Sequence, residues 1–125
     1  MLNEFDLVPT LPAGDMERAK RFYAEKLGLT LEREDPAGVQ YVSGSTRFTL
    51  YPTRFAGSGQ HTLGGWVVDD IERVVSELRE RGVVFEEYDF PGLKTEGGIA
   101  DLVSERAAWF KDSEGNILGL FQYAA

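Results

Sequence analysis

The sequence predicts an α+β fold in which two copies of one βαβββ module form an open cup. One observation is an internal repeat: Asp15 and Asp70 are 55 positions apart, and Gly28 and Gly82 are 54 apart. The other is the order of elements, because each half has an extended apolar stretch, an amphipathic segment and three short apolar segments separated by turns. The chain is therefore expected to be one domain, 1–125, with modules at about 1–53 and 61–125 joined by a short linker.

One amphipathic helix is expected in each module. Asp15 and Asp70 precede the apolar-periodic runs, and a short carboxylate there accepts hydrogen bonds from the free amides of the first turn. Apolar residues then recur at helical spacing over 16–27 and 71–78. Gly28 and Gly82 stand where a left-handed C-cap is expected.

Short strands are expected on both sides of each helix. In the first module they are residues 5–11, 29–34, 39–43 and 47–52, and in the second 62–68, 83–88, 107–111 and 116–122. Pro-Ala-Gly, Ser-Gly-Ser and Asp-Ser-Glu-Gly turns separate them. Residues 53–61 are expected to form the linker. Residues 90–105, rich in glycine and charge, are expected to form a long loop, either an ordered lid or a disordered insertion.

Composition excludes several classes of protein. The absence of cysteine excludes a disulfide framework, a thiolate nucleophile and a cysteine metal site. A net charge of −8 disfavours nucleic acid as a partner, and it either keeps the protein in solution or attracts a cationic small molecule. Neither a signal peptide nor an apolar run of about 20 residues is found, so we expect a cytoplasmic protein without a membrane partner.

Three motifs in order suggest a family. They are Asp-Met-Glu-Arg-Ala-Lys-Arg-Phe-Tyr at 15–23 with Leu-Gly-Leu at 27–29, Val-Asp-Asp-Ile at 68–71 with Arg-Gly-Val at 81–83, and Trp-Phe-Lys-Asp-Ser-Glu-Gly-Asn-Ile at 109–117. With them the chain resembles the vicinal oxygen chelate (VOC) superfamily of glyoxalases, bleomycin resistance proteins and extradiol dioxygenases. The resemblance covers nearly the whole chain and implies the cup-shaped fold. It does not choose a function, because this fold hosts lyases, isomerases, dioxygenases, thiol transferases and drug-binding proteins.

The resemblance also points to where a metal would be bound. Metal-using members carry one ligand on the first strand and one on the fourth strand of each module, and the matching positions here are Val8, Thr49, Leu63 and Gly119. Valine, leucine and glycine offer no side-chain donor, and one neutral threonine does not hold a divalent ion. His61, the single histidine, lies two residues before Leu63 without a histidine partner. We therefore expect no metal and no cofactor.

Strand parity indicates which side chains line the cup, since alternate residues share a face. Phe48, Leu118 and Trp66 are expected to pack against the helices, and Trp109 is preferred over Phe110 for the cup. Because the family places a glutamate where Gly119 stands, the cup centre is expected to be roomy and neutral, with Arg47 as its main charge. The predicted ligand-binding residues are Arg47, Thr49, Tyr51, His61, Trp109, Gly119 and Phe121.

Such a pocket is aromatic but lacks a nucleophile and a paired general base, so it should bind rather than react. The leading hypothesis is a metal-free small-molecule-binding protein of the glyoxalase/bleomycin resistance type, which sequesters an aromatic or drug-like ligand. One alternative is a divergent VOC enzyme, a lyase, isomerase or dioxygenase using His61, Tyr51 or Glu86 in a non-standard site. Another is a structural or regulatory partner domain, so enzymatic activity stays an open question. A homodimer is expected because open strand edges favour association.

Overall fold

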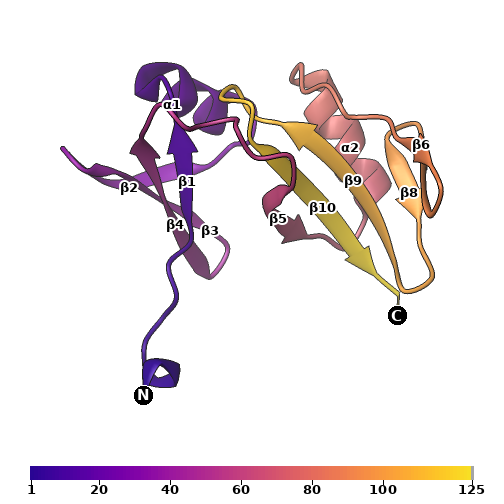
Figure 1. Cartoon of the computed structure of the whole chain (residues 1–125), viewed down its shortest axis with the longest axis horizontal. Coiled ribbons are helices and arrows are strands. Elements are labelled where there is room, and N and C mark those ends of the chain that lie inside the picture. The colour runs from indigo at the N-terminus through magenta and orange to yellow at the C-terminus, as the bar shows by residue number, and fades with distance from the viewer. Residues whose placement is uncertain (125) are drawn as a thin grey trace.

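Two open sheets, each accompanied by one helix, make up the computed structural model, which describes residues 1–124 (Figure 1). The first sheet has the order β1-β4-β3-β2, with β1 parallel to β4. We call residues 10–52 the first module. Its elements, after a short 3-10 helix η1 (Leu2–Glu4), are β1 (Thr10–Ala13), α1 (Met16–Glu25), β2 (Thr30–Asp35), β3 (Gly38–Ser43) and β4 (Thr46–Pro52).

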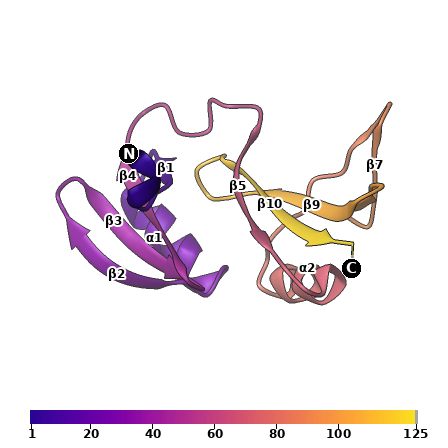
Figure 2. The same cartoon turned by 90° about the horizontal axis from the view of Figure 1, so that it is seen from below.

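The second sheet has six strands in the order β5-β10-β9-β8-β7-β6, with β5 parallel to β10, and we call residues 62–123 the second module. The two modules lie side by side, and α2 covers one face of the second sheet (Figure 2). The α+β prediction of two open, repeated modules is confirmed. The elements are β5 (Thr62–Val67), α2 (Ile71–Glu80), β6 (Asp89–Phe90), β7 (Leu93–Glu96), β8 (Ile99–Asp101), β9 (Glu105–Lys111) and β10 (Ile117–Tyr123).

Both helices begin and end as the sequence predicts. The Asp15 and Asp70 carboxylates accept hydrogen bonds from the amides three residues later, each at 3.1 Å. Gly28 and Gly82 adopt φ angles of 71° and 91°, a left-handed conformation that glycine reaches without a steric penalty. Local rules of capping therefore set the helix ends.

The second module departs from the expected strands after α2. The strand predicted at 83–88 is wrong, because this segment forms only a single bridge between Phe85 and Phe110. The loop prediction for 90–105 is also wrong in part, since β7 and β8 form a hairpin there and β8 pairs with β9. Gly97 and Gly98, with φ of 59° and 82°, provide the backbone conformation that this hairpin turn requires.

The first strand is shorter than expected, because β1 begins at Thr10 instead of residue 5. Residues 1–9, which we call the N-terminal arm, project away from the first sheet (Figure 1). Its apolar side chains are exposed, with Leu2 at 75%, Phe5 at 67% and Leu7 at 90%. The arm leaves the edge of β4 open over Thr46–Phe48, because the β1 pairing covers only the later part of β4.

The cores follow the predicted strand parity. Phe48, Leu50, Leu118 and Leu120 are buried, as expected for residues that face the helices. Phe110 is fully buried against Trp66 and Phe85. Trp109, the next residue along β9, must therefore face the opposite side of the sheet.

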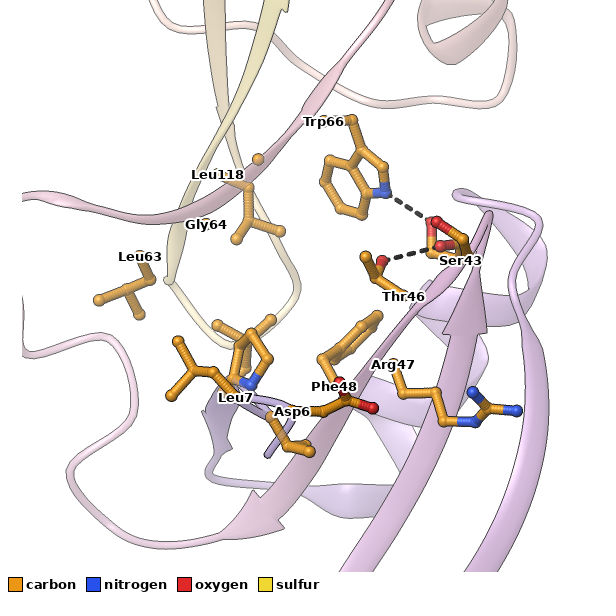
Figure 3. A pocket seen from close by; sticks show the side chains of 15 residues that line it. Asp6, Leu7, Ser43, Thr46, Arg47, Phe48, Leu63, Gly64, Trp66 and Leu118 are labelled. Carbon is orange, nitrogen blue, oxygen red and sulfur yellow. Dashed lines mark hydrogen bonds between the residues drawn. The ribbon is translucent and has the colours of Figure 1, made fainter. Parts of the chain in front are cut away.

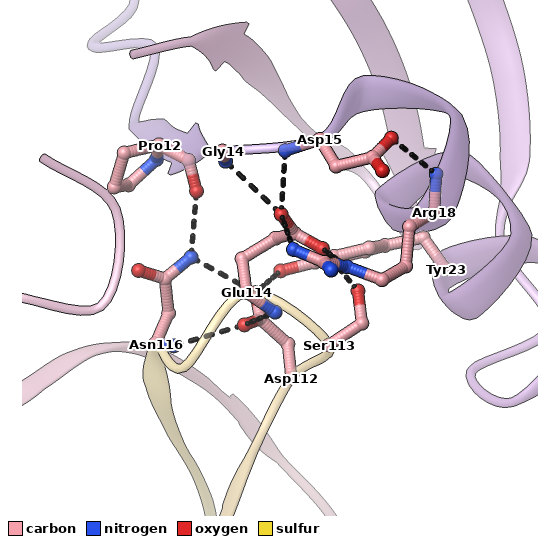
Figure 4. A network of polar contacts seen from close by, with 9 residues as sticks. All are labelled: Pro12, Gly14, Asp15, Arg18, Tyr23, Asp112, Ser113, Glu114 and Asn116. Atoms are coloured by element: carbon pink, nitrogen blue, oxygen red, sulfur yellow. Dashed lines mark hydrogen bonds and ion pairs between the residues drawn. The ribbon is translucent and has the colours of Figure 1, made fainter. Parts of the chain in front are cut away.

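A polar network fastens the β9–β10 turn of the second module to the start of α1 in the first (Figure 4). Glu114 Oε1 accepts hydrogen bonds from the backbone amides of Gly14 at 3.0 Å and Asp15 at 2.8 Å. Arg18 Nε donates to Glu114 Oε2 at 2.9 Å, and Ser113 Oγ donates to the same oxygen at 2.7 Å. The Glu114 side chain thus binds the free amides that precede the helix.

Asp112 extends this network into the core. Tyr23 Oη donates to Asp112 Oδ2 at 2.6 Å, and Asn116 Nδ2 donates to the same oxygen at 2.9 Å. Asn116 Nδ2 also donates to the carbonyl oxygen of Pro12 at 2.8 Å. We call this network, with its centre at Asp112, Glu114 and Asn116, the polar clamp.

Burial alone would raise the pKa of Glu114, but hydrogen bonds from Arg18, Ser113 and the Asp15 amide outweigh it and lower the pKa to about 2. For Tyr23, burial is the main cause that raises the pKa far above its usual value, and the neighbouring Asp112 charge adds to it. At ordinary pH the polar clamp therefore contains a charged Glu114 carboxylate and a neutral Tyr23 phenol.

Among residues 1–124, no helix is both long and apolar enough to cross a bilayer.

Candidate ligand-binding site

A cavity of about 500 Å³ separates the two modules, where β4 and the N-terminal arm face β5 and β10 (Figure 3). We call it the larger cavity. It is largely apolar, and its size falls in the range of about 300–1,000 Å³ that is common for small-molecule sites. It is lined by residues 6–9, Leu11, Ser43, residues 45–48, residues 63–66 and Leu118.

Trp66 on β5 is the largest side chain of this cavity. Its indole lies nearly parallel to the ring of Phe110, with centroids 6.3 Å apart and an interplanar angle of 14°. Its Nε1 donates a hydrogen bond across the module boundary to Ser43 Oγ at 2.9 Å (Figure 3). The stacking on Phe110 and the hydrogen bond to Ser43 therefore fix the position of the indole. The Trp66 side chain is half-buried and borders the cavity.

Phe48 and Leu118 complete an apolar wall. Phe48 lies on β4 and packs against the rings of Tyr41 and Tyr23, at centroid distances of 5.5 and 5.8 Å. Leu118 lies on β10, is 1% exposed and belongs to the main core. The wall thus continues the core of both modules and is fixed by it.

Two ionisable side chains, Asp6 and Arg47, stand among the lining residues. Arg47 Nε lies 3.0 Å from each carboxylate oxygen of Glu32, and its guanidinium points away from the cavity (Figure 3). Arg47, expected as the main charge of the cup centre, therefore lies in an ion pair with Glu32 instead of standing alone as a cation. This ion pair leaves the cavity without a fixed cation.

A smaller cavity of about 270 Å³ lies on the other side of Trp66 and Ser43, which line both. Its remaining residues are all apolar. They come from the segment after α1, from α2, and from the second sheet and the residue after β5: Leu27, Leu29, Val67, Val68, Val74, Leu78, Phe110 and Leu120.

The structure brings few of the predicted site residues to these cavities. Arg47 lines the larger cavity, whereas Thr49 and Tyr51 face the other side of β4 from Phe48. His61 is exposed in the segment before β5 and lies against Gly59.

Trp109 is half-buried and lines neither cavity. Its ring contacts Tyr88 in a T-shaped pair with centroids 5.6 Å apart, and Tyr88 in turn contacts Phe90 at 5.8 Å. Burial, helped by the charge of Glu86, raises the pKa of Tyr88. These rings form an aromatic cluster at the far side of the second sheet.

The gap expected at Gly119 is filled. Gly119 pairs with Gly65, and a Cβ atom built on either residue would lie 2.5 Å from the ring of Phe121. The Phe121 ring therefore covers both glycines. The prediction of a roomy cup centre at Gly119 is wrong, because the Phe121 ring occupies that space. Strand parity gave the face of Phe121 but not the direction in which its ring folds.

The positions matched to the family's metal ligands are only partly gathered. Val8 and Leu63 line the larger cavity, and Thr49 and Gly119 do not. Within residues 1–124 no cluster of three or more histidine, cysteine, aspartate or glutamate side chains has a geometry suited to a metal ion. The lining residues that the structure describes include no hydrogen-bonded pair of nucleophile and base.

Sequence reasoning missed Ser43, Phe48 and Leu118 as site residues. Strand parity assigned Phe48 and Leu118 to the core, and both are buried there. Because they lie at the boundary between the modules, they also line the larger cavity. Trp66 on the edge strand β5 could have indicated this, since it follows two glycines at 64–65, and glycine within a strand often marks a close approach of a ligand or another backbone.

A family model for the Glyoxalase/Bleomycin resistance protein/Dioxygenase superfamily matches residues 6–120, and the chain belongs to this superfamily. A search of curated protein sequences found no match.

Solved structures support the fold. UcmS2 is 18% identical with a TM-score of 0.74, over 94% of this chain and 98% of its own. A glyoxalase/bleomycin resistance protein/dioxygenase from Alicyclobacillus acidocaldarius is 20% identical with a TM-score of 0.74, over 100% and 96%. TnmS3, described as an antibiotic binding protein from Streptomyces sp. CB03234, is 24% identical with a TM-score of 0.66, over 96% and 98%.

Proposed function

We propose that the protein binds a planar, aromatic or drug-like small molecule in the larger cavity, without a metal ion. The observation that carries this proposal is the cavity of about 500 Å³ with Trp66 and Phe48 in its wall. Aromatic rings bind flat ligands through burial and offset or edge-to-face contacts, without covalent chemistry. The antibiotic-binding description of TnmS3, a protein of the same fold, is consistent with this role.

The ligand is expected to be neutral or weakly basic. Glu32 neutralises Arg47, and Asp6 is the other ionisable group of the lining. The net charge of −8 also disfavours anions at long range. Arg47 alone would favour a weakly acidic ligand, but its ion pair with Glu32 removes that preference.

The two tryptophans give a direct test, because Trp66 lines the larger cavity and Trp109 does not. A panel of planar aromatic compounds is titrated into the parent, Trp66→Phe and Trp109→Phe, and fluorescence and melting temperature are recorded. Quenching should persist in Trp109→Phe and disappear in Trp66→Phe, and a ligand should raise the melting temperature of the parent.

Quenching that is lost in Trp109→Phe and kept in Trp66→Phe would move the site to the cluster of Trp109, Tyr88 and Phe90. Failure of the whole panel to quench or stabilise the parent would contradict the proposed function. Conversion of a bound compound would favour the enzyme alternative.

A further inference from the structure

The smaller cavity has no role in the proposed binding of an aromatic ring. Leu27 and Leu29 line it on the first module, and Val74 and Leu78 of α2 line it on the second. Its one polar lining side chain is Ser43, whose hydroxyl already accepts the hydrogen bond from Trp66. Water in such a space would find few partners, so an apolar occupant is favoured.

Trp66 and Ser43 line both cavities, so their contact lies between the two spaces. The contact contains one neutral hydrogen bond of 2.9 Å. Such a bond has a small net free energy, so a ligand that buries apolar surface on both sides can displace it.

We propose that the smaller cavity is a second subsite that binds the apolar chain of an amphiphilic ligand whose aromatic head occupies the larger cavity. The proposal rests on the proposed function for the head and adds a tail site to it. The polar side chains of Asp6, Ser45 and Thr46 line the larger cavity and not the smaller one. The lining chemistry therefore places the polar end of the ligand there and the chain beside Val74 and Leu78.

The test uses alkyl 4-hydroxybenzoates from methyl to octyl, which share one head and differ only in chain length. Binding is measured through Trp66 fluorescence in a Trp109→Phe background. Affinity should rise by about fourfold for each methylene that is buried. It should then level off when the chain reaches the end of the smaller cavity.

Two variants at Val74, a lining residue of α2, change the length of the tail site in opposite directions. Val74→Phe should move the plateau to shorter chains, and Val74→Ala should move it to longer ones. The affinity for the methyl ester should stay within twofold in both. Val84, 82% exposed and outside both linings, supplies matched controls as Val84→Phe and Val84→Ala. Far-UV circular dichroism checks folding, and Val74→Ala keeps the test decisive if Val74→Phe does not fold.

Equal affinities for the methyl and octyl esters in the parent would overturn the tail site while leaving head binding intact. So would chain-length profiles at Val74 that match those at Val84. If no ester binds to the parent at all, the proposed function fails and the tail site fails with it.

Discussion

Replacing Glu114 by glutamine tests whether the polar clamp holds the modules together. The substitution keeps the shape of the side chain but removes its charge and one acceptor. Arg18 Nε and Ser113 Oγ would then face an amide group where they now bind a carboxylate oxygen. Exposed ion pairs have little effect on stability, but Glu114 itself is buried, so its loss should be measurable.

The pKa gives the magnitude of the effect. A pKa of about 2 in place of 4.5 corresponds to at most about 3.4 kcal/mol of stabilisation. Because the Arg18 side chain is 51% exposed, screening reduces this, and we expect a loss of about 2 kcal/mol in the free energy of unfolding.

The pH dependence has a defined sign. A carboxyl group whose pKa is lowered by folding stabilises the protein above pH 4.5, and this stabilisation is lost as pH falls from about 4.5 to about 2. Glu114→Gln should therefore be less stable than the parent at pH 7, with a difference that shrinks toward pH 2.5. Urea denaturation at several pH values measures both quantities.

Glu25→Gln is the matched control, because Glu25 is exposed and its side chain makes no hydrogen bond or ion pair within the described residues. It should change stability by less than about 0.5 kcal/mol. A Glu114→Gln protein as stable as the parent at pH 7, or a difference that is the same at pH 7 and pH 2.5, would show that the Glu114 charge does not stabilise the fold.

The remaining expectations concern a buried tyrosine, the paired glycines, metals and assembly. Tyr23→Phe removes the buried hydrogen bond to Asp112 and should lower the free energy of unfolding by about 1–3 kcal/mol in urea denaturation; an unchanged value would count against a role for this bond. A Cβ at Gly65 would lie 2.5 Å from a backbone oxygen, whereas at Gly119 it would meet the movable ring of Phe121. Gly65→Ala should therefore lower the melting temperature more than Gly119→Ala, and the reverse order would contradict this geometry. Added Ni²⁺, Zn²⁺ or Mn²⁺ should leave the melting temperature unchanged, since the matched positions lack donors; a saturable increase would reveal a metal site. The exposed apolar arm favours a homodimer, and sedimentation at micromolar concentration giving only the monomer mass of 13.9 kDa would rule it out.

Much of the fold could be predicted because it depends on local patterns. Capping by Asp15, the left-handed glycine at Gly28 and the alternation of Trp109 and Phe110 each follow from a few neighbouring residues. The strand expected at 83–88 failed because Val83 and Phe85 are buried by side-chain packing, and Phe85 makes one bridge to Phe110 in place of a ladder.

The site was less predictable because it depends on distant pairs. The bond from Asp15 N to Glu114 spans 99 positions, and in the sequence Glu114 is simply one acidic residue of a turn. The neutralisation of Arg47 by Glu32 and the folding of Phe121 over Gly65 likewise depend on strand register and rotamer. Strand parity assigns a residue to a face of the sheet, but it gives neither the strand register nor the side-chain rotamer.

The unequal fastening of the two modules has a consequence for how a ligand enters. On one side, the clamp combines a buried carboxylate with backbone amides and Arg18, and bonds of this kind are about twice as strong as neutral ones. On the other side, Trp66 and Ser43 share one neutral bond. A ligand that enters between the modules should therefore displace the Trp66–Ser43 contact before it disturbs the clamp. Trp66 would then mark the point of entry as well as part of the cavity wall.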